Sequence, residues 1–386
     1  MTNERVIAVI HTVPESEWLI ELYATMLCDG VSTSAHHAVE LRDKFLFDGG
    51  FIQGNVLLVD GRPVNTRVGD DKGLGRSSVN LQRESWGWFL GWKGRHVPCR
   101  PLSQPQIVRT HVGQYGCISD YVRLHAPQIL FAAPLRQCIF GAIGQGCKFC
   151  TFEMRRSELV PEELMARWLT TVLMKCPEVT SLAVGGGTPN LVDYGSNYYG
   201  SIVRRVKDSF PGIRASIEIV PSGRGDDLRL LRDSGYDAAI MSLEVWDEAI
   251  RQRVCPGKGR VSRDEYMSAW TNAIEKFGEG QVASVLLVGL EPEESTIEGI
   301  DALVDLGVIP TLIPFRPYNG TPLVGHPRTT VEAYLRCSRY CTHRLRGAGL
   351  SPSGQYGCTG CGGCSLEVVQ EYGAGQPITV CAAEVT

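Results

Sequence analysis

A repeating pattern of apolar runs and amphipathic segments constrains the fold of residues 128–347 more than any other feature of the sequence. Six short apolar runs each precede a segment with helical spacing, and most are bounded by Gly or Pro. The runs are 129–134, 182–184, 215–220, 238–243, 282–290 and 311–315. Short apolar runs that alternate with helices are typical of parallel strands covered on both faces. We therefore predict an α/β fold, a partial (β/α)6 TIM-like barrel.

Helix signals fall between the apolar runs. Pro161 suits the first turn of a helix, and Gly235 suits the position just after the end of one. The helices predicted from the spacing of apolar residues are 161–175, 198–210, 226–234, 263–277, 295–306 and 329–346.

The composition changes on both sides of the predicted barrel. Residues 1–127 contain short strand-like runs such as 7–10 and 56–59, while the polar, Gly-rich composition of 62–83 predicts little order. We interpret this part as an N-terminal accessory region that seals the barrel. Residues 348–386 are rich in Gly and Cys and are predicted to be a C-terminal auxiliary iron–sulfur segment. The barrel domain then comprises residues 128–347.

Charge and hydropathy narrow the function classes. The chain has 42 acidic and 38 basic residues and a formal net charge of -4, and this charge balance disfavours a nucleic acid partner. No apolar run is long enough for a signal peptide core or a membrane span, which predicts a cytoplasmic protein with no membrane partner. Because disulfides rarely persist in the cytoplasm, the 14 cysteines indicate metal binding.

Cys138, Cys147 and Cys150 follow the first apolar run of the barrel. Active sites of such barrels lie at the carboxyl ends of the strands. Three thiolates can hold three irons of a [4Fe–4S] cluster and leave the fourth iron open to a ligand. A zinc site or three separate buried thiols is the alternative, but a zinc site wants a fourth ligand nearby, and His125 precedes the strand.

A second cysteine motif lies in the tail, where Cys358, Cys361 and Cys364 are separated by two residues each and interleaved with glycines. This spacing resembles ferredoxin-type ligation of an iron–sulfur cluster, and a zinc site is the alternative. The candidates for a fourth ligand are Cys381, Cys337 and Cys341. The scattered cysteines expected to act as small buried hydrophobic residues are Cys28, Cys99, Cys117, Cys176 and Cys255.

Other candidate residues lie at the predicted strand ends. The second strand ends in Gly185, Gly186, Gly187 and Thr188, where glycines would bring the backbone close to a ligand or simply form a turn. Glu218 and Glu244 lie in apolar runs, and a buried carboxylate needs a partner such as a ribose hydroxyl, an ammonium group or an arginine. A structural ion pair with Arg316 is the alternative role for Glu218.

These stretches resemble the radical S-adenosylmethionine (SAM) superfamily over about residues 128–365. Its usual signature is C-x3-C-x2-C with an aromatic residue before the third cysteine. Phe149 keeps the aromatic position, whereas the first gap here has eight residues. Gly185–Gly187 looks like the methionine-binding Gly-Gly-Glu strand with Gly187 in place of the acid. Residues 288–290 are similar to the adenine-binding segment, and 320–323 to an ending seen in biotin-synthase-like members.

Within the superfamily, the chain is most similar to radical proteins of bacterial nitrilase-containing gene clusters. Three stretches carry this likeness, namely 138–150, 254–258 and 358–364.

The resemblance implies a [4Fe–4S] cluster on Cys138, Cys147 and Cys150 whose open iron binds SAM, and we expect a second iron–sulfur cluster on the tail cysteines. The residues expected to contact the cofactor are Phe149, Gly185, Gly186, Gly187, Thr188, Glu218, Glu244, Gly289 and Arg316. An electron donor such as flavodoxin or ferredoxin would reduce the cluster, and SAM cleavage would start radical chemistry on a small-molecule substrate in specialised metabolism. Transfer of a 3-amino-3-carboxypropyl radical and a non-catalytic metal-binding scaffold are the alternatives. No catalytic residue is assigned.

Overall fold

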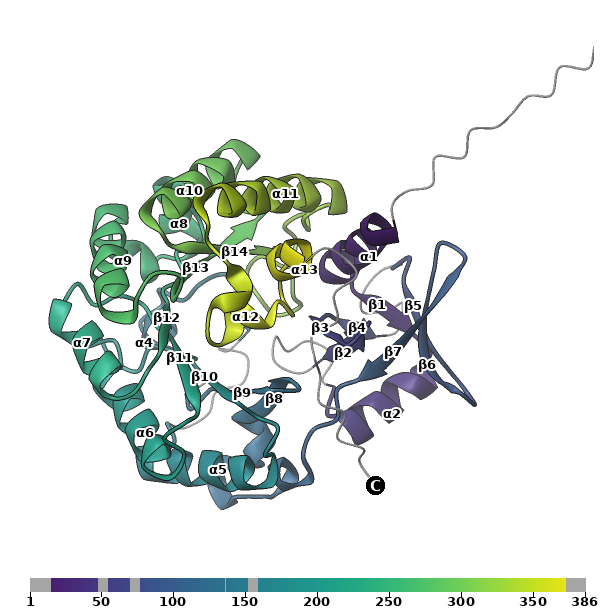
Figure 1. Ribbon diagram of the computed structural model, residues 1–386, viewed down its shortest axis with the longest axis horizontal. Helices are drawn as coiled ribbons and strands as arrows, with labels where there is room; N and C mark the ends of the chain where they lie inside the picture. Colours follow the sequence, from purple (N-terminus) through teal and green to yellow (C-terminus); the bar gives the residue numbers. More distant parts are fainter. Residues whose placement is uncertain (1–14, 48–54, 70–76, 136, 152–158, 373–386) are drawn as a thin grey trace, which may run out of the picture.

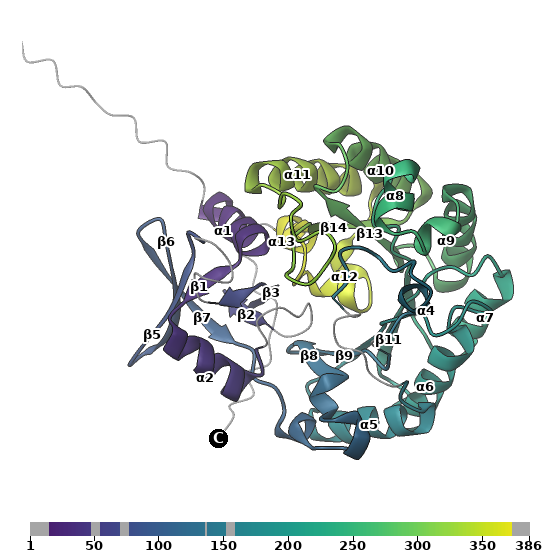
Figure 2. The ribbon, with the colours of Figure 1, turned by 180° about the vertical axis from the view of Figure 1, so that it is seen from behind.

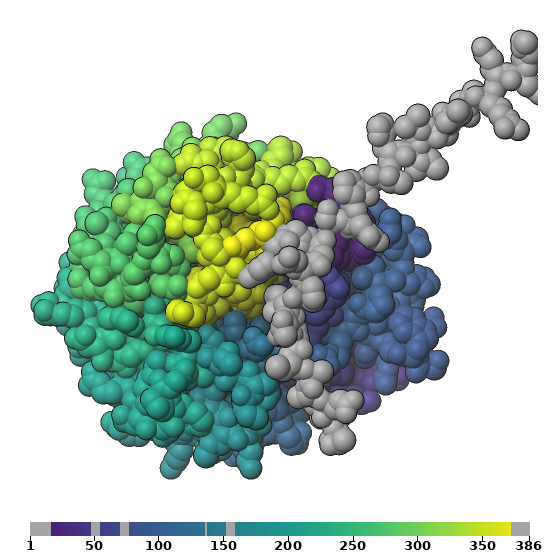
Figure 3. All heavy atoms as spheres, in the orientation of Figure 1, coloured from purple at the N-terminus to yellow at the C-terminus, as the bar shows by residue number. Residues whose placement is uncertain are grey.

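The computed structural model describes residues 15–47, 55–69, 77–135, 137–151 and 159–372, which form an N-terminal sheet and a curled barrel sheet side by side (Figures 1 and 2). The Cys-rich tail lies against the centre of the barrel (Figure 3). Among the helices of these residues, none combines the length and apolar character that crossing a membrane requires.

The barrel sheet has the strand order β14-β13-β12-β11-β10-β9-β8. Strands β9 to β14 pair in parallel, and β8 pairs antiparallel with β9 at the edge. The strands are β8 (Val122–Ala126), β9 (Ile129–Ala132), β10 (Ser181–Val184), β11 (Arg214–Glu218), β12 (Ala238–Ile240), β13 (Val282–Val288) and β14 (Ile309–Pro314). The six predicted parallel strands and the α/β partial barrel are therefore confirmed. β8 precedes residue 128 in the sequence and still belongs to the barrel sheet.

Helices cover the outer face of this sheet (Figure 1). They are α5 (Glu162–Lys175), α6 (Ser196–Ser209), α7 (Gly225–Asp233), α8 (Glu248–Val254), α9 (Arg263–Phe277), α10 (Glu293–Leu306) and α11 (Val331–Ala348). Six of the seven match predicted helices. The sequence did not predict α8, because seven residues are too few to show helical spacing, although the Asp247 side chain caps it by accepting a hydrogen bond from the Ile250 amide at 2.8 Å.

The N-terminal region is a mixed sheet with the strand order β3-β2-β7-β6-β5-β1-β4. Its elements are α1 (Glu15–Asp29), β1 (Val31–Thr33), α2 (Ala35–Phe45), β2 (Val56–Val59), β3 (Arg62–Asn65), β4 (Val68–Gly69), β5 (Asn80–Glu84), β6 (Gly87–Trp92) and β7 (Arg95–Pro101). The expectation of little order over 62–83 is wrong for 62–65, 68–69 and 80–83, because pairing with β2 and β1 orders these residues as strands. Residues 70–76 lie outside the described residues. The run 7–10 lies outside the described residues.

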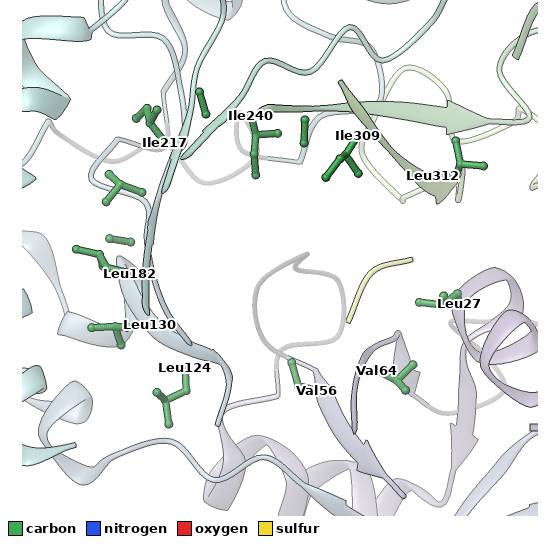
Figure 4. Close-up of a cluster of buried hydrophobic side chains, with 14 of the residues drawn as sticks. Leu27, Val56, Val64, Leu124, Leu130, Leu182, Ile217, Ile240, Ile309 and Leu312 are labelled. Atoms are coloured by element: carbon green, nitrogen blue, oxygen red, sulfur yellow. The ribbon is translucent and has the colours of Figure 1, made fainter. Parts of the chain in front are cut away.

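One continuous apolar core joins the two sheets. Figure 4 shows Leu27, Val56 and Val64 of the N-terminal region across from barrel residues such as Leu124 and Leu312, and all five belong to the same buried cluster. Burial of shared apolar surface is the main favourable term that holds two such units together. The N-terminal region is therefore part of the wall around the barrel.

The tail folds back into the barrel after α11. It forms two short helices, α12 (Cys358–Cys361) and α13 (Glu367–Tyr372), and the buried Glu367 carboxylate accepts a hydrogen bond from the Leu312 amide of β14 at 3.3 Å. The Thr359 and Thr311 hydroxyls are 3.1 Å apart. The threonine contact places α12 inside the ring of strands, because Thr311 and Thr359 both line the cavity there. Glu367 also contacts Ser338 of the outer helix α11, so α13 lies at the β14 edge of the sheet.

Candidate functional site

A cavity fills the lumen of the barrel, with about 290 Å³ of space open to the centres of water molecules. Its wall consists of aromatic and aliphatic side chains with a few charged groups. Five cysteines line it, three from the first motif and two from the tail. They are Cys138, Cys147, Cys150, Cys358 and Cys364. The two motifs, more than 200 residues apart in the sequence, thus share one cavity.

The first cysteine motif forms the loop after β9, with a single helical turn, α4 (Ile139–Ala142), behind Cys138. Backbone hydrogen bonds fix this loop to its neighbours. The Ile139 amide donates to the Thr188 carbonyl at 2.7 Å, and the Lys148 amide donates to the Val254 carbonyl at 2.8 Å. The Thr188 amide lies 3.4 Å from the Cys138 sulfur and donates to it. An amide aimed at a ligating sulfur is a common feature of iron–sulfur sites.

The glycines at the end of β10 allow the cysteine loop to pack closely on this strand. A Cβ atom at Gly187 would lie 2.7 Å from the Gln137 carbonyl oxygen, and one at Gly186 would lie 2.7 Å from the Leu135 carbonyl oxygen. Both distances are too short for any side chain. Gly186, Gly187 and Thr188 line the cavity, whereas Gly185 packs against Glu218. Among the described residues, Gly186 and Gly187 therefore let the loop that carries Cys138 pack closely against the end of β10.

Glu244 and Lys258 form a buried ion pair in the cavity. Lys258 Nζ lies 2.5 Å from Glu244 Oε1 and also donates to the Ser242 carbonyl at 3.2 Å. Burial lowers the pKa of Lys258, but the Glu244 carboxylate and the nearby Cys147 raise it well above its usual value. Lys258 is thus held as a cation beside the first cysteine motif. Sequence reasoning did not identify this pair, since Lys258 begins a short 3-10 helix beyond α8 and no local pattern links it to Glu244.

Cys255 is buried, as the sequence predicted, but it also contacts the first motif. A hydrogen bond with Cys255, together with burial, raises the pKa of the Cys147 thiol well above its usual value. Metal ions bind the thiolate form and displace its proton. Cys147 is therefore a thiol that gains its ligand form on metal binding.

The other predicted cofactor residues separate into two groups. Phe149 and Arg316 line the cavity, and Arg316 Nη1 is buried with no hydrogen-bond partner in the described residues. A cationic atom of this kind suits an anionic ligand. Gly289 does not line the cavity. It has a φ of 97°, and a Cβ there would lie 2.3 Å from the Thr329 hydroxyl, so its described role is close packing.

The second cysteine motif enters the lumen from the amino ends of the strands. Gly357 has a φ of 112°, and a Cβ there would lie 1.9 Å from the Ser216 hydroxyl of β11. The Tyr356 amide donates to the Gln281 side chain, directly before β13, at 3.0 Å. The tail thus closes the end of the barrel opposite to the first motif.

His125 and Asn65 lie beside the tail cysteines. The two nitrogens of the His125 ring lie 3.7 Å from Cys358 Sγ and 3.9 Å from Cys364 Sγ. Asn65 Nδ2 donates to Cys364 Sγ at 3.4 Å. Sequence reasoning weighed His125 only against the first motif, because the reversal of chain direction between β8 and β9 cannot be seen from spacing alone.

Glu218 is half-buried in the cavity between the two motifs and forms a hydrogen bond with the Cys358 thiol. Burial raises its pKa, although His125, this hydrogen bond and Lys258 lower it. Burial also lowers the pKa of His125, against the opposing effect of Glu218. Among the described residues, Glu218 forms no ion pair with Arg316, so the structural ion pair considered for these two is absent there.

The proposed fourth ligands of the tail differ in position. Cys337 and Cys341 are fully buried on α11 and do not line the cavity, and Cys341 Sγ lies 4.0 Å from the Pro310 carbonyl. Cys381 lies outside the described residues. No three His, Cys, Asp or Glu side chains among the described residues are already placed to hold a single metal ion.

The donor set of the first motif fits a four-iron cluster. Three half-buried thiols face one cavity, an amide is aimed at the Cys138 sulfur, and no fourth ligand from the motif closes the site. Iron–sulfur clusters prefer thiolate ligands with amide donors around them. The residues present therefore fit the group that the family implies.

Comparison with known families identifies the domain that carries this site. Residues 138–306 match the model of the radical SAM superfamily. The chain therefore contains a radical SAM superfamily domain, which confirms the predicted resemblance to this superfamily of enzymes. A [4Fe–4S] cluster and SAM are the cofactors that the family implies.

Individual relatives share only part of the chain. Bacteriochlorophyllide c C-7(1)-hydroxylase of Chlorobaculum limnaeum is 26% identical over 128 residues, which are 33% of this chain and 32% of that protein. The match thus spans about a third of this curated relative. Methylornithine synthase has a TM-score of 0.43 at 19% identity, covering 57% of this chain and 68% of that one. A radical SAM methyltransferase from Sphaerobacter thermophilus has a TM-score of 0.45 at 17% identity, covering 72% and 77%.

Proposed function

We propose that this protein reductively cleaves SAM at a [4Fe–4S] cluster on Cys138, Cys147 and Cys150 and directs the resulting radical to a small molecule in the barrel. The observation that carries this proposal is the single cavity lined by both cysteine motifs. When bound, the cluster and SAM supply the electron and the radical. The protein binds, orients and encloses the reactants.

The charged residues of the cavity suit the binding of SAM. SAM carries an ammonium, a carboxylate, a sulfonium and ribose hydroxyls. The Lys258 cation is held beside Cys147 by Glu244, and Glu218 offers a carboxylate deeper in the lumen. Phe149 packs in an apolar cluster with Leu287 and Phe315. This apolar wall excludes water from the site of radical formation.

We propose that the N-terminal region seals the open side of the barrel. Arg67 Nη1 donates to the Pro317 carbonyl at 3.2 Å, and the Arg67 guanidinium lies 5.1 Å from the centre of the Tyr318 ring. An Arg67→Ala variant that still couples SAM cleavage tightly to product formation would contradict a sealing role for this contact.

We also propose that the tail cysteines hold an auxiliary iron–sulfur cluster that binds substrate or passes electrons. Its place at the opposite end of the cavity supports this assignment. The similarity to a hydroxylase supports a reaction at a C–H bond of a small molecule. The likeness of 138–150, 254–258 and 358–364 to radical proteins of nitrilase-containing gene clusters supports a place in specialised metabolism. An electron donor such as flavodoxin or ferredoxin would serve the first cluster.

The test is an anaerobic reconstitution with iron and sulfide, followed by SAM and dithionite. Two four-iron clusters predict about eight irons per chain. Mass spectrometry of the nucleoside products is expected to show 5′-deoxyadenosine, and a Cys147→Ala variant is expected to show none above background. Methylthioadenosine would instead indicate 3-amino-3-carboxypropyl transfer. Zinc in place of iron, with no SAM cleavage, would contradict the proposal and indicate a metal-binding scaffold.

A further inference from the structure

A β-bulge turns His125 into the cavity. Strands β8 and β9 pair Leu124 with Leu130 and Ala126 with Ile129, so His125 is an extra residue with no partner across the ladder. A bulge of this kind re-aims a side chain and is common next to functional sites. His125 is 4% exposed and lines the cavity. The backbone irregularity thus places one imidazole inside the lumen.

The imidazole contacts both outer cysteines of the tail motif. Nδ1 lies 3.7 Å from Cys358 Sγ, and Nε2 lies 3.9 Å from Cys364 Sγ. Asn65 Nδ2 is 3.4 Å from both His125 Nε2 and Cys364 Sγ. The Phe131 ring packs at 5.6 Å between ring centres. The barrel wall therefore fixes the ring beside the two thiols that would bind a tail centre.

Within the part of the tail that the structure describes, which excludes Cys381, the motif lacks one donor. It supplies three thiolates, whereas a closed four-iron cluster or a structural zinc site takes four ligands. Cys337 and Cys341 lie outside the cavity wall, and Glu218 reaches only Cys358. His125 is the neighbour that Cys358 and Cys364 share.

We propose that His125 is the nitrogen ligand of the tail metal centre, which then has a Cys3His donor set with Asn65 as a hydrogen-bond donor to the Cys364 sulfur. This inference rests on the proposed function only in that the tail binds a metal centre. All three thiols must rotate about their Cα–Cβ bonds on binding, since Cys361 packs in an apolar cluster with Ile129 and Phe131 and no three donors among the described residues already converge on one ion.

A neutral imidazole in place of a fourth thiolate removes one negative charge from the centre. Histidine ligation raises the reduction potential of Rieske clusters relative to all-cysteine clusters. The same substitution here makes the tail cluster easier to reduce than a four-cysteine cluster. Because the histidine completes the four protein ligands of the tail cluster, only the cluster of the first motif keeps an iron open to a ligand.

The test isolates the tail centre in the full-length chain. Cys138, Cys147 and Cys150 are replaced by alanine, and the protein is reconstituted anaerobically with iron and sulfide. About four irons per chain are expected to remain. Pulsed electron paramagnetic resonance of the reduced protein is expected to show a strong nitrogen coupling that changes on ¹⁵N-histidine labelling. His125→Cys is expected to keep the irons, lose this coupling and lower the reduction potential. His343→Gln, an exposed change on α11, is the matched control and leaves all three readouts unchanged.

The outcomes separate this inference from the proposed function. A four-iron signal without histidine coupling, or with coupling that persists in His125→Cys, overturns the inference and leaves the auxiliary cluster intact. If the tail binds only zinc, the auxiliary cluster is wrong. X-ray absorption of the zinc protein then tests the inference. One nitrogen and three sulfur ligands support it, and four sulfur ligands overturn it. If His125→Cys does not fold, recovery of a nitrogen coupling by added imidazole in His125→Gln supports the inference, and its failure in a folded protein overturns it.

Discussion

The two cysteine motifs occupy opposite ends of one cavity and are held in different ways. The first motif is fixed by backbone contacts, with the Thr188 amide on Cys138 and a glycine strand end behind the loop. The tail motif is surrounded by side chains from distant parts of the chain, namely His125, Asn65 and Glu218. In the proposed function, the first motif keeps a coordination position open for SAM, and in the proposed Cys3His centre the tail is closed by protein donors.

The largest expected effect is a separation of the two motifs by mutation. Cys147→Ala is expected to lose about four of about eight irons and all SAM cleavage above background, because the first cluster cannot form. Cys364→Ala is expected to lose a similar amount of iron and to retain SAM cleavage without product. Iron analysis and nucleoside mass spectrometry measure both. Loss of SAM cleavage to background in both variants would show that the motifs do not act separately.

The ion pair beside the first motif gives the next largest effect. Lys258→Met leaves the buried Glu244 carboxylate without its cation, and breaking a buried pair in this way costs about 3–5 kcal/mol. We expect a lower free energy of unfolding in urea and a weaker first cluster, with the tail iron retained. Lys258→Arg, which keeps the charge, is the control. If both variants lose the same stability and the same iron, the shape of the Lys258 side chain and not its charge explains the effect.

The tail has its own pH dependence through Glu367. Burial raises the pKa of this carboxyl from 4.5 to about 7, so the fold favours the protonated form. Between pH 4.5 and about pH 7, the carboxyl is ionised in the unfolded chain but protonated in the folded protein. Stability therefore falls as the pH rises through this window, by about 3 kcal/mol at most.

Glu367→Gln is expected to stabilise the protein at pH 8 and to have little effect at pH 4.5, as urea unfolding measures. The exposed Glu294→Gln on α10 is the control. An effect of Glu367→Gln that is equal at both pH values would contradict the assignment.

The glycines give the smallest effects and test each end of the cavity by itself. Gly187→Ala forces a Cβ to within 2.7 Å of the Gln137 carbonyl, and Gly357→Ala forces one to within 1.9 Å of the Ser216 hydroxyl. Each is expected to cost about 1–3 kcal/mol, as for overpacking. Gly187→Ala weakens iron binding by the first motif, and Gly357→Ala weakens it in the tail. Gly212→Ala, with nothing within 4 Å, is the control. Equal iron loss at both motifs in either variant would contradict this separation.

The barrel was predictable from the sequence because buried parallel strands and their helices leave strong local patterns. The position of the Cys138 loop at a strand end followed from the same patterns. The N-terminal strands over 62–83 were missed, because their polar residues are ordered by pairing with distant strands. The approach of Asn65 to Cys364 spans 299 residues. No local pattern reports such a contact.

The Gly363 carbonyl accepts a hydrogen bond from the Asn65 amide at 2.6 Å, next to the sulfur contact of the same residue. During synthesis, the N-terminal sheet and the barrel strands emerge before residue 363 does, and contacts so distant in sequence form late. The cavity therefore stays open at its tail end through most of synthesis and closes last. Pulse-labelled hydrogen exchange during refolding should protect residues 357–372 after the barrel strands. Metal delivered before that closing step can therefore reach the tail motif before its thiols are enclosed in the barrel.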